Sequence, residues 1–203
     1  QRNSRSQLAI ISGACCATAS PDVVIAALGD VFPDQLEWSL GQLKQKLAAG
    51  RLTATPETCF SGFDAWKKVL ASDVDMVILA APPFFRPQHL EAAIQAGKHV
   101  FTEKPVAVDP LGVRSVIATS ELAAKKGLAI VAGTQRRHQA HYLEIMKRVR
   151  AGDLGELVAG QCYWNMGALW VERAAQNWAN KSAKKWSDME WQIRNWLFTG
   201  WCS

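Results

Sequence analysis

The sequence predicts an α/β protein with a Rossmann-type parallel sheet, followed by the start of a mixed α/β domain. Short apolar runs rich in β-branched residues alternate with helical patterns of about ten to fifteen residues, which is typical of βαβ units. Such runs predict strands that are buried on both faces. Glycines and prolines stand where runs and helices end. From Glu156 onward the alternation stops, which indicates a different kind of structure.

The first part of the chain predicts a helix, a strand and a second helix. The first helix begins after Ser4 or Ser6, and the strand covers Val23–Leu28. The second helix has an apolar face of leucines at spacings of four, three and four, namely Leu36, Leu40, Leu43 and Leu47. A dinucleotide-binding fold starts with a strand and a G-x-G-x-x-G turn. The sequence has neither, so we expect both to precede Gln1.

The middle of the chain continues the same pattern. Three further strands are predicted, over Val74–Ala80, His99–Phe101 and Leu128–Ala132. They are joined by helices from about Arg86 to Ala96 and from about Pro110 to Lys126, each closed by a glycine. Helical connections make the strands parallel, so their carboxyl ends meet at one edge of the sheet. Open α/β sheets bind ligands at that edge.

Lys104 is the first candidate for chemistry at this edge. Glu103, Lys104 and Pro105 come directly after a predicted strand. Proline fixes φ and has no N–H group, so it ends the strand and redirects the chain. The alternative is a surface lysine that pairs with Glu103. The sequence does not decide whether the Lys104–Pro105 bond is cis or trans.

Asp30 is the second candidate. It follows a predicted strand at the place where the dinucleotide-binding fold has the acid that binds the ribose. A carboxylate there accepts hydrogen bonds from ribose hydroxyls and repels a 2′-phosphate, which favours NAD over NADP. The alternative is an aspartate that only ends a strand. His138 and His141 are three residues apart but have no acidic partner motif, so we predict no metal site.

Several motifs together resemble one family of oxidoreductases. They are Ala80-Ala81-Pro82-Pro83, His89-Leu90, Ala96-Gly97-Lys98-His99-Val100, Glu103-Lys104-Pro105 and Gly133-Thr134-Gln135-Arg136-Arg137. The chain resembles the glucose–fructose oxidoreductase, inositol dehydrogenase and rhizopine-catabolism (Gfo/Idh/MocA) family over essentially its whole length. The Glu-Lys-Pro motif is the most specific part of this resemblance.

The resemblance implies a dinucleotide-binding domain over residues 1–133 and the beginning of a substrate-binding and oligomerisation domain over 134–203. It implies NAD, with NADP as the alternative, and hydride transfer to or from a sugar- or polyol-like secondary alcohol. It places Lys104 near the nicotinamide and the reacting hydroxyl, and the remaining catalytic residues beyond Ser203. We therefore expect an internal piece of a longer protein, inactive by itself.

The sequence is also compatible with other functions. One is a glycoside-cleaving enzyme of the same family that keeps NAD bound. Others are a non-catalytic protein that binds nucleotides or sugars, and an inactive truncated protein.

Two sets of residues make up the predicted site. The cofactor-binding set is Asp30, Ala81, Pro82, Pro83, Glu103, Lys104, Gln135 and Arg136. The substrate-binding set is Lys104, Arg137, Trp164 and Asn165. Tryptophan rings can stack on sugar faces, although most serve as core or interface area. For one of Arg136 and Arg137, the alternative is a side chain that is solvated or that bridges the two domains.

The last part of the chain is rich in tryptophan, since seven of nine lie beyond residue 160. We predict a strand over Leu157–Asn165 and a short helix over Glu190–Trp196. Between them, Trp170–Trp186 has little periodicity and predicts a long loop that closes over substrate or packs on a neighbouring subunit.

Composition excludes some classes of protein. The net charge of +5 suits an anionic dinucleotide, and the basic clusters match no nucleic-acid motif. The five cysteines lack metal-ligand spacing and predict reduced thiols. The longest apolar run is too short to span a bilayer. We expect a cytoplasmic protein, or an exported one whose leader precedes Gln1, that binds neither nucleic acid nor membrane and forms a homo-oligomer at full length.

Overall fold

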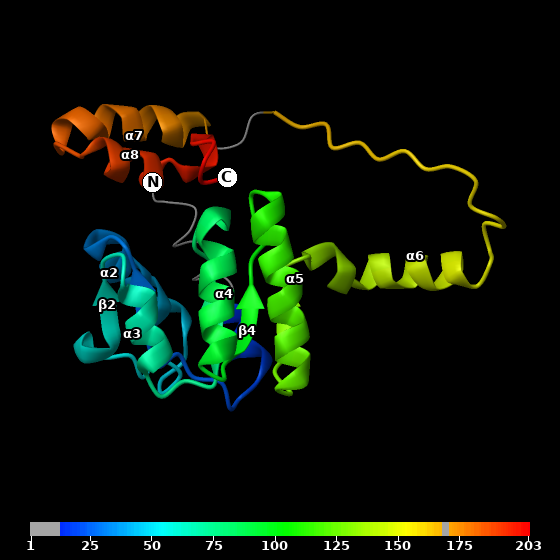
Figure 1. The fold of residues 1–203 in the computed structure, drawn as a ribbon, viewed down its shortest axis with the longest axis horizontal. Helices are drawn as coiled ribbons and strands as arrows, with labels where there is room; N and C mark the ends of the chain where they lie inside the picture. The colour runs from blue at the N-terminus through cyan, green and yellow to red at the C-terminus, as the bar shows by residue number, and fades with distance from the viewer. Residues whose placement is uncertain (1–12, 168–170) are drawn as a thin grey trace.

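Parallel strands and connecting helices form the main body of the molecule, as predicted (Figure 1). The computed structural model describes residues 13–167 and 171–203. The strands are β1 (Leu28–Asp30), β2 (Cys59–Ser61), β3 (Met76–Leu79), β4 (His99–Thr102) and β5 (Ile130–Ala132). The helices among and after them are α2 (Pro33–Lys46), α3 (Ala65–Ala71), α4 (Arg86–Gln95) and α5 (Pro110–Lys125). A helical segment over 13–19 precedes them, while the predicted caps Ser4 and Ser6 lie outside the described residues.

The strands pair in two parallel sheets, one of order β1-β2 and one of order β3-β4-β5. These pairings match the 3-2 and 4-5-6 parts of the doubly wound order 3-2-1-4-5-6. Within residues 13–167 and 171–203, no strand joins β1 to β3. The predicted parallel direction is confirmed for β3, β4 and β5, whereas β1 pairs in parallel with β2, a strand that was not predicted. The fold is Rossmann-like.

The first strand is shorter and later than predicted. Of the predicted range Val23–Leu28, only Leu28 belongs to β1, and Ile25 forms an isolated parallel bridge with Leu52. The length of a strand depends on its partner, and β2 pairs only with Leu28–Asp30. The sequence pattern does not predict β2 or α3, because a three-residue strand and a seven-residue helix leave no clear periodicity.

Helices α4 and α5 cover one face of the β3-β4-β5 sheet, and Figure 1 shows them side by side in front of β4. Leu90, Ala93 and Ile94 share one face of α4 and are fully buried or nearly so. They pack with Val77, Leu79, Val100 and Ala123 in the main core. This packing fixes the carboxyl ends of β3, β4 and β5 relative to one another.

The region after β5 differs most from the prediction. Residues 157–165 form no strand and are exposed, since no other part of the described chain pairs with their backbone. The loop predicted over 170–186 is instead mostly helix α7 (Val171–Ala183), whose alanine, glutamine and lysine residues have high helix propensity. Helix α6 (Ala140–Arg150) projects from the body and is followed by an extended segment (Figure 1).

The chain ends in helix α8 (Asp188–Arg194) and the 3₁₀ turn η4 (Trp196–Phe198). Ser187 caps α8, with its Oγ accepting a hydrogen bond from the N–H of Glu190. This helix confirms the short helix predicted there, but begins two residues before Glu190. In the part of the chain that the structure describes, no helix has the length and apolar character to cross a membrane.

Candidate functional site

Most of the predicted site residues follow the carboxyl ends of the strands. Asp30 is the last residue of β1. Ala81, Pro82 and Pro83 follow β3, and both prolines are fully buried. Glu103 and Lys104 follow β4, while Gln135, Arg136 and Arg137 lie in the 3₁₀ turn η3 (Gln135–His138) after β5.

Arg86 holds the backbone on both sides of Lys104. This arginine is the first residue of α4 and is only 2% exposed. Its Nη1 donates to the carbonyl oxygen of Glu103 at 2.7 Å and also to that of Pro105. The Lys104–Pro105 bond is cis, and the Lys104 side chain is exposed. The structure therefore fixes the main chain of the lysine and leaves its ammonium group at the surface.

The buried position of Arg86 also places a positive charge under this loop. Burial lowers the pKa of Arg86 to about 10, and the nearby charge of Glu103 acts in the opposite direction. The guanidinium group is thus still protonated at neutral pH. The sequence pattern does not mark Arg86 as part of the site, because arginine is rarely buried. The one indication in the sequence is the position of Arg86, which begins the predicted helix shortly after Ala81, Pro82 and Pro83.

The ends of β4 and β5 approach each other closely at Gly133. A Cβ atom on this glycine would lie 2.5 Å from Oε2 of Glu103, so a larger side chain would displace the carboxylate. The Gly133 N–H donates to the carbonyl oxygen of Thr102 at 2.8 Å. The glycine of the Gly133–Arg137 motif therefore leaves room for the acid of the Glu-Lys-Pro motif.

Asp30 has a structural contact of its own. Its Oδ1 accepts a hydrogen bond from the Phe32 N–H at 2.9 Å, which closes the turn that leads into α2. This contact uses one carboxylate oxygen. The structural role given as the alternative for Asp30 is therefore present.

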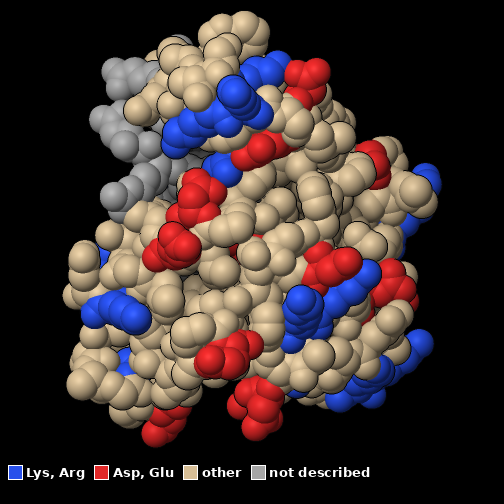
Figure 2. Space-filling model, turned by 90° about the vertical axis from the view of Figure 1, so that its left-hand side faces the viewer, with Lys and Arg blue, Asp and Glu red and all other residues tan. Residues whose placement is uncertain are grey.

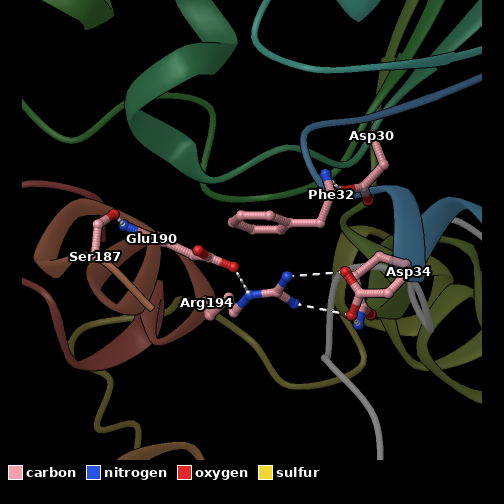
Figure 3. Close-up of polar contacts among 7 residues, drawn as sticks. Asp30, Phe32, Asp34, Ser187, Glu190 and Arg194 are labelled. Atoms are coloured by element: carbon pink, nitrogen blue, oxygen red, sulfur yellow. Dashed lines mark hydrogen bonds and ion pairs between the residues drawn. The ribbon is translucent and has the colours of Figure 1, made fainter. Parts of the chain in front are cut away.

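Just beyond Asp30, a second acid forms an ion pair with the end of the chain (Figure 3). Arg194 donates from Nη2 and Nη1 to the two carboxylate oxygens of Asp34, at 2.8 and 3.1 Å. Its Nε donates to Glu190 at 3.0 Å. Burial alone would raise the pKa of Asp34, but hydrogen bonds from Arg194 and Gln35 and the charge of Arg194 hold it below its usual value.

The same arginine lies between aromatic rings. Its guanidinium carbon is 3.8 Å from the ring centre of Phe32 and 4.5 Å from that of Trp186. Burial acts to lower the pKa of Arg194, but hydrogen bonds and charges from Asp34 and Glu190 raise it overall. The side chain therefore stays charged while it is only 8% exposed.

The end of the chain also contacts the loop after β3. The ring of Trp201 lies edge-on to Phe84 and Phe85, with ring centres 5.2 and 6.1 Å apart. The Phe84 N–H donates to the carbonyl oxygen of Cys202 at 3.4 Å, and Cys202 is fully buried.

Figure 2 shows basic side chains gathered over the α7–α8 end of the molecule, with acidic side chains beside them.

Two predicted substrate residues lie in a different environment. Trp164 and Asn165 belong to the extended segment after α6 and are exposed. The guanidinium carbon of Arg136 is 4.2 Å from the Trp164 ring centre, so η3 contacts this segment. His138 and His141 are exposed, and no cluster of His, Cys, Asp or Glu within the described ranges can hold a metal ion.

Part of the chain is similar in sequence to a known family of proteins. Residues 42–134 match the family model GFO_IDH_MocA, described as an oxidoreductase family with an NAD-binding Rossmann fold. Inositol 2-dehydrogenase 4 of Saccharopolyspora erythraea is 37% identical over 114 residues, which is 56% of this chain and 33% of that protein. An inositol 2-dehydrogenase of Rhodococcus erythropolis is 29% identical over 126 residues, covering 62% of this chain and 34% of that protein.

Solved structures resemble a larger share of the chain. The apo scyllo-inositol dehydrogenase of Lactobacillus casei has a TM-score of 0.56 at 26% identity, covering 72% of this chain and 39% of its own. The form of that enzyme with bound NAD(H) and scyllo-inositol has a TM-score of 0.53, also at 26% identity, covering 71% of this chain and 39% of its own. The chain spans about a third of the length of the two curated relatives above.

Proposed function

We propose that the complete protein transfers hydride between NAD and a sugar- or polyol-like secondary alcohol, because residues 42–134 match the model of the Gfo/Idh/MocA oxidoreductase family. The main support is the position of Lys104 after β4, where Arg86 fixes the backbone on both of its sides. Ligands of open α/β sheets bind beyond the carboxyl ends of the strands. The related enzyme with bound NAD(H) and scyllo-inositol supports the choice of cofactor and substrate class.

Lys104 acts on the reacting hydroxyl in this proposal. Oxidation of a secondary alcohol removes a hydride from its carbon and a proton from its oxygen. The nicotinamide ring supplies the hydride chemistry when the cofactor is bound. The Lys104 ammonium donates a hydrogen bond to the hydroxyl oxygen and so stabilises the negative charge that develops as the hydroxyl proton passes to a base, which is solvent water or a further side chain of the complete protein.

Asp30 gives the cofactor preference. Its carboxylate at the end of β1 accepts hydrogen bonds from the adenosine ribose of NAD, and repels the 2′-phosphate of NADP. Its hydrogen bond with the Phe32 N–H makes Asp30→Asn the matched variant, since an amide oxygen preserves that bond without the charge. We expect this substitution to shift the ratio of kcat/KM values toward NADP.

The test is an absorbance assay at 340 nm of the complete gene product with NAD and a panel of inositols, other polyols and aldoses. We expect NADH formation with at least one of them, and a loss of about 10² to 10⁴ in kcat for Lys104→Ala. Lys125→Ala, an exposed lysine at the end of α5, is the control and should keep full activity.

Two results would contradict the proposal. One is a complete protein that forms no NADH with any member of the panel. The other is a Lys104→Ala variant as active as Lys125→Ala. Release of an aglycone from a glycoside without net NADH would instead favour the glycoside-cleaving alternative.

A further inference from the structure

The last residues of the chain connect the two sheets at their carboxyl edges. Segment 186–203 contacts Phe32 and Asp34 after β1, and Phe84 and Phe85 after β3. In the doubly wound order, β1 and β3 are the strands on either side of the central position. The dinucleotide crosses the sheet edge at that place, so segment 186–203 lies beside the expected path of the cofactor.

Arg194 makes the strongest of these contacts. Its bidentate bond to Asp34 is charge-assisted, and such pairs are both stronger and more directional than single hydrogen bonds. The third donor, Nε, bonds to Glu190. Lysine cannot reproduce this planar fork or its stacking on aromatic rings.

The turn that contains Phe32 is held from two sides. Asp30 accepts its backbone N–H, while the Arg194 guanidinium lies 3.8 Å from the centre of its ring. Figure 3 shows Asp30, Phe32 and Asp34 above and beside Arg194, which comes from α8. The residue that anchors the turn thus lies 160 positions along the chain from Asp34.

We propose that Arg194 is a positioning residue for cofactor binding, which orients the Asp30 carboxylate toward the adenosine ribose by fixing the turn from Val31 to Asp34. This inference rests on the proposed function and extends it to a residue that does not touch the cofactor. A fixed turn lowers the ordering cost of binding, because the acid is already in place. Loss of Arg194 therefore weakens the adenosine half of the site and spares the nicotinamide half.

The experiment compares Arg194→Ala and Arg194→Lys with the wild-type complete protein. Arg148→Ala is the matched control, since Arg148 pairs with Glu144 at the same i,i+4 spacing on an exposed face of α6. Hydrogen exchange of residues 31–36 is measured without cofactor. Calorimetry then gives the affinities for NAD, ADP-ribose and nicotinamide mononucleotide.

We expect Arg194→Ala to speed exchange in 31–36 about tenfold and to weaken NAD and ADP-ribose binding about tenfold, which corresponds to about 1.4 kcal/mol. Nicotinamide mononucleotide should bind as before. Arg194→Lys should fall between wild type and Arg194→Ala, and it decides the question if Arg194→Ala does not fold. Arg148→Ala should match the wild type.

Several outcomes would overturn the inference. Unchanged exchange in 31–36 would show that Arg194 does not hold the turn. Faster exchange with unchanged ADP-ribose affinity would show that the turn does not orient Asp30 for the ribose. An equal loss of affinity for ADP-ribose and for nicotinamide mononucleotide would indicate that Arg194 has a purely structural role. A wild-type protein that binds no NAD would contradict the proposed function and the cofactor part of the inference together, while the exchange data would still decide whether Arg194 holds the turn.

Discussion

At the scale of single residues, three arginines organise loops from buried or partly buried positions. Arg86 donates to the carbonyl oxygens around Lys104, and Arg194 pairs with Asp34. Arg51 donates to carbonyl oxygens at the end of the helical segment over 13–19 and just after it, those of Ala17, Ser20 and Pro21. In each case one guanidinium group, with its several N–H donors, connects parts of the chain that are distant in sequence. Arg86 and Arg51 bond to carbonyl oxygens, whereas Arg194 bonds to the carboxylates of Asp34 and Glu190.

His89 gives the protein a dependence of stability on pH. Its ring centre lies 4.8 Å from that of Trp66 and 6.1 Å from that of Phe85, and burial lowers its pKa to about 4. In the unfolded chain His89 has its ordinary pKa of about 6.5. Between pH 4 and pH 6.5 the unfolded state therefore binds more protons than the folded state. The contribution of neutral His89 to the free energy of unfolding is complete above about pH 6.5. It falls by up to roughly 3 kcal/mol as the pH decreases toward 4.

The check is urea unfolding of wild type and His89→Phe at pH 7.5 and 5.0. We expect the free energy of unfolding of the variant to change less between the two values, because phenylalanine keeps the ring contacts and does not titrate. His138→Gln alters an exposed histidine of η3 and should behave as wild type. An identical pH dependence in wild type and His89→Phe would refute this assignment.

At the scale of elements, the packing of α3 against β1 depends on a glycine. A Cβ atom on Gly29 would lie 3.0 Å from Cγ2 of Val69 and 3.6 Å from Ala65, both in α3. Gly41 is the contrasting case, since it lies within α2 and a Cβ atom there would meet nothing within 4 Å. The first glycine permits contact between two elements, whereas the second only weakens its helix.

These positions predict opposite effects of the same substitution. Gly41→Ala should stabilise the protein by roughly 0.5–1 kcal/mol, since alanine favours helix. Gly29→Ala should destabilise it by roughly 1–3 kcal/mol through overpacking. The measurement is the urea midpoint at constant m-value. A stabilising Gly29→Ala would mean that α3 packs less closely on β1 than described.

At the scale of the whole molecule, segment 186–203 closes over the ends of both sheets, and its thiol reports on that contact. Cys202 is fully buried, while Cys15 and Cys162 are exposed. We expect a short iodoacetamide pulse to label the two exposed cysteines first and Cys202 last, as read by mass spectrometry. Trp201→Ala removes the ring contacts with the loop after β3, so it should speed labelling of Cys202 alone.

The predicted order of labelling is contradicted if Cys202 in the wild type reacts with iodoacetamide as fast as Cys162. It is also contradicted if Trp201→Ala leaves the labelling of Cys202 unchanged. Either outcome would mean that segment 186–203 does not stay on the sheet edge in solution.

The sequence by itself determined the parts of the fold that follow local rules. Apolar runs and helical spacing gave β3, β4, β5 and the helices between them within a few residues, and the parallel direction follows from their helical connections. The same reasoning placed Asp30 and Lys104 at strand ends. These features depend on residues close together in the chain, so their pattern is visible in one dimension.

Only the tertiary structure decided the rest. Leu157–Asn165 has the composition of a strand but forms none, since a strand exists only with a partner. Arg86 and Arg194 look like surface residues in the sequence, yet folding buries both against distant groups, with Arg194 160 positions from Asp34. A charge is buried only where a partner offsets its desolvation, and that partner is known only after the chain has folded.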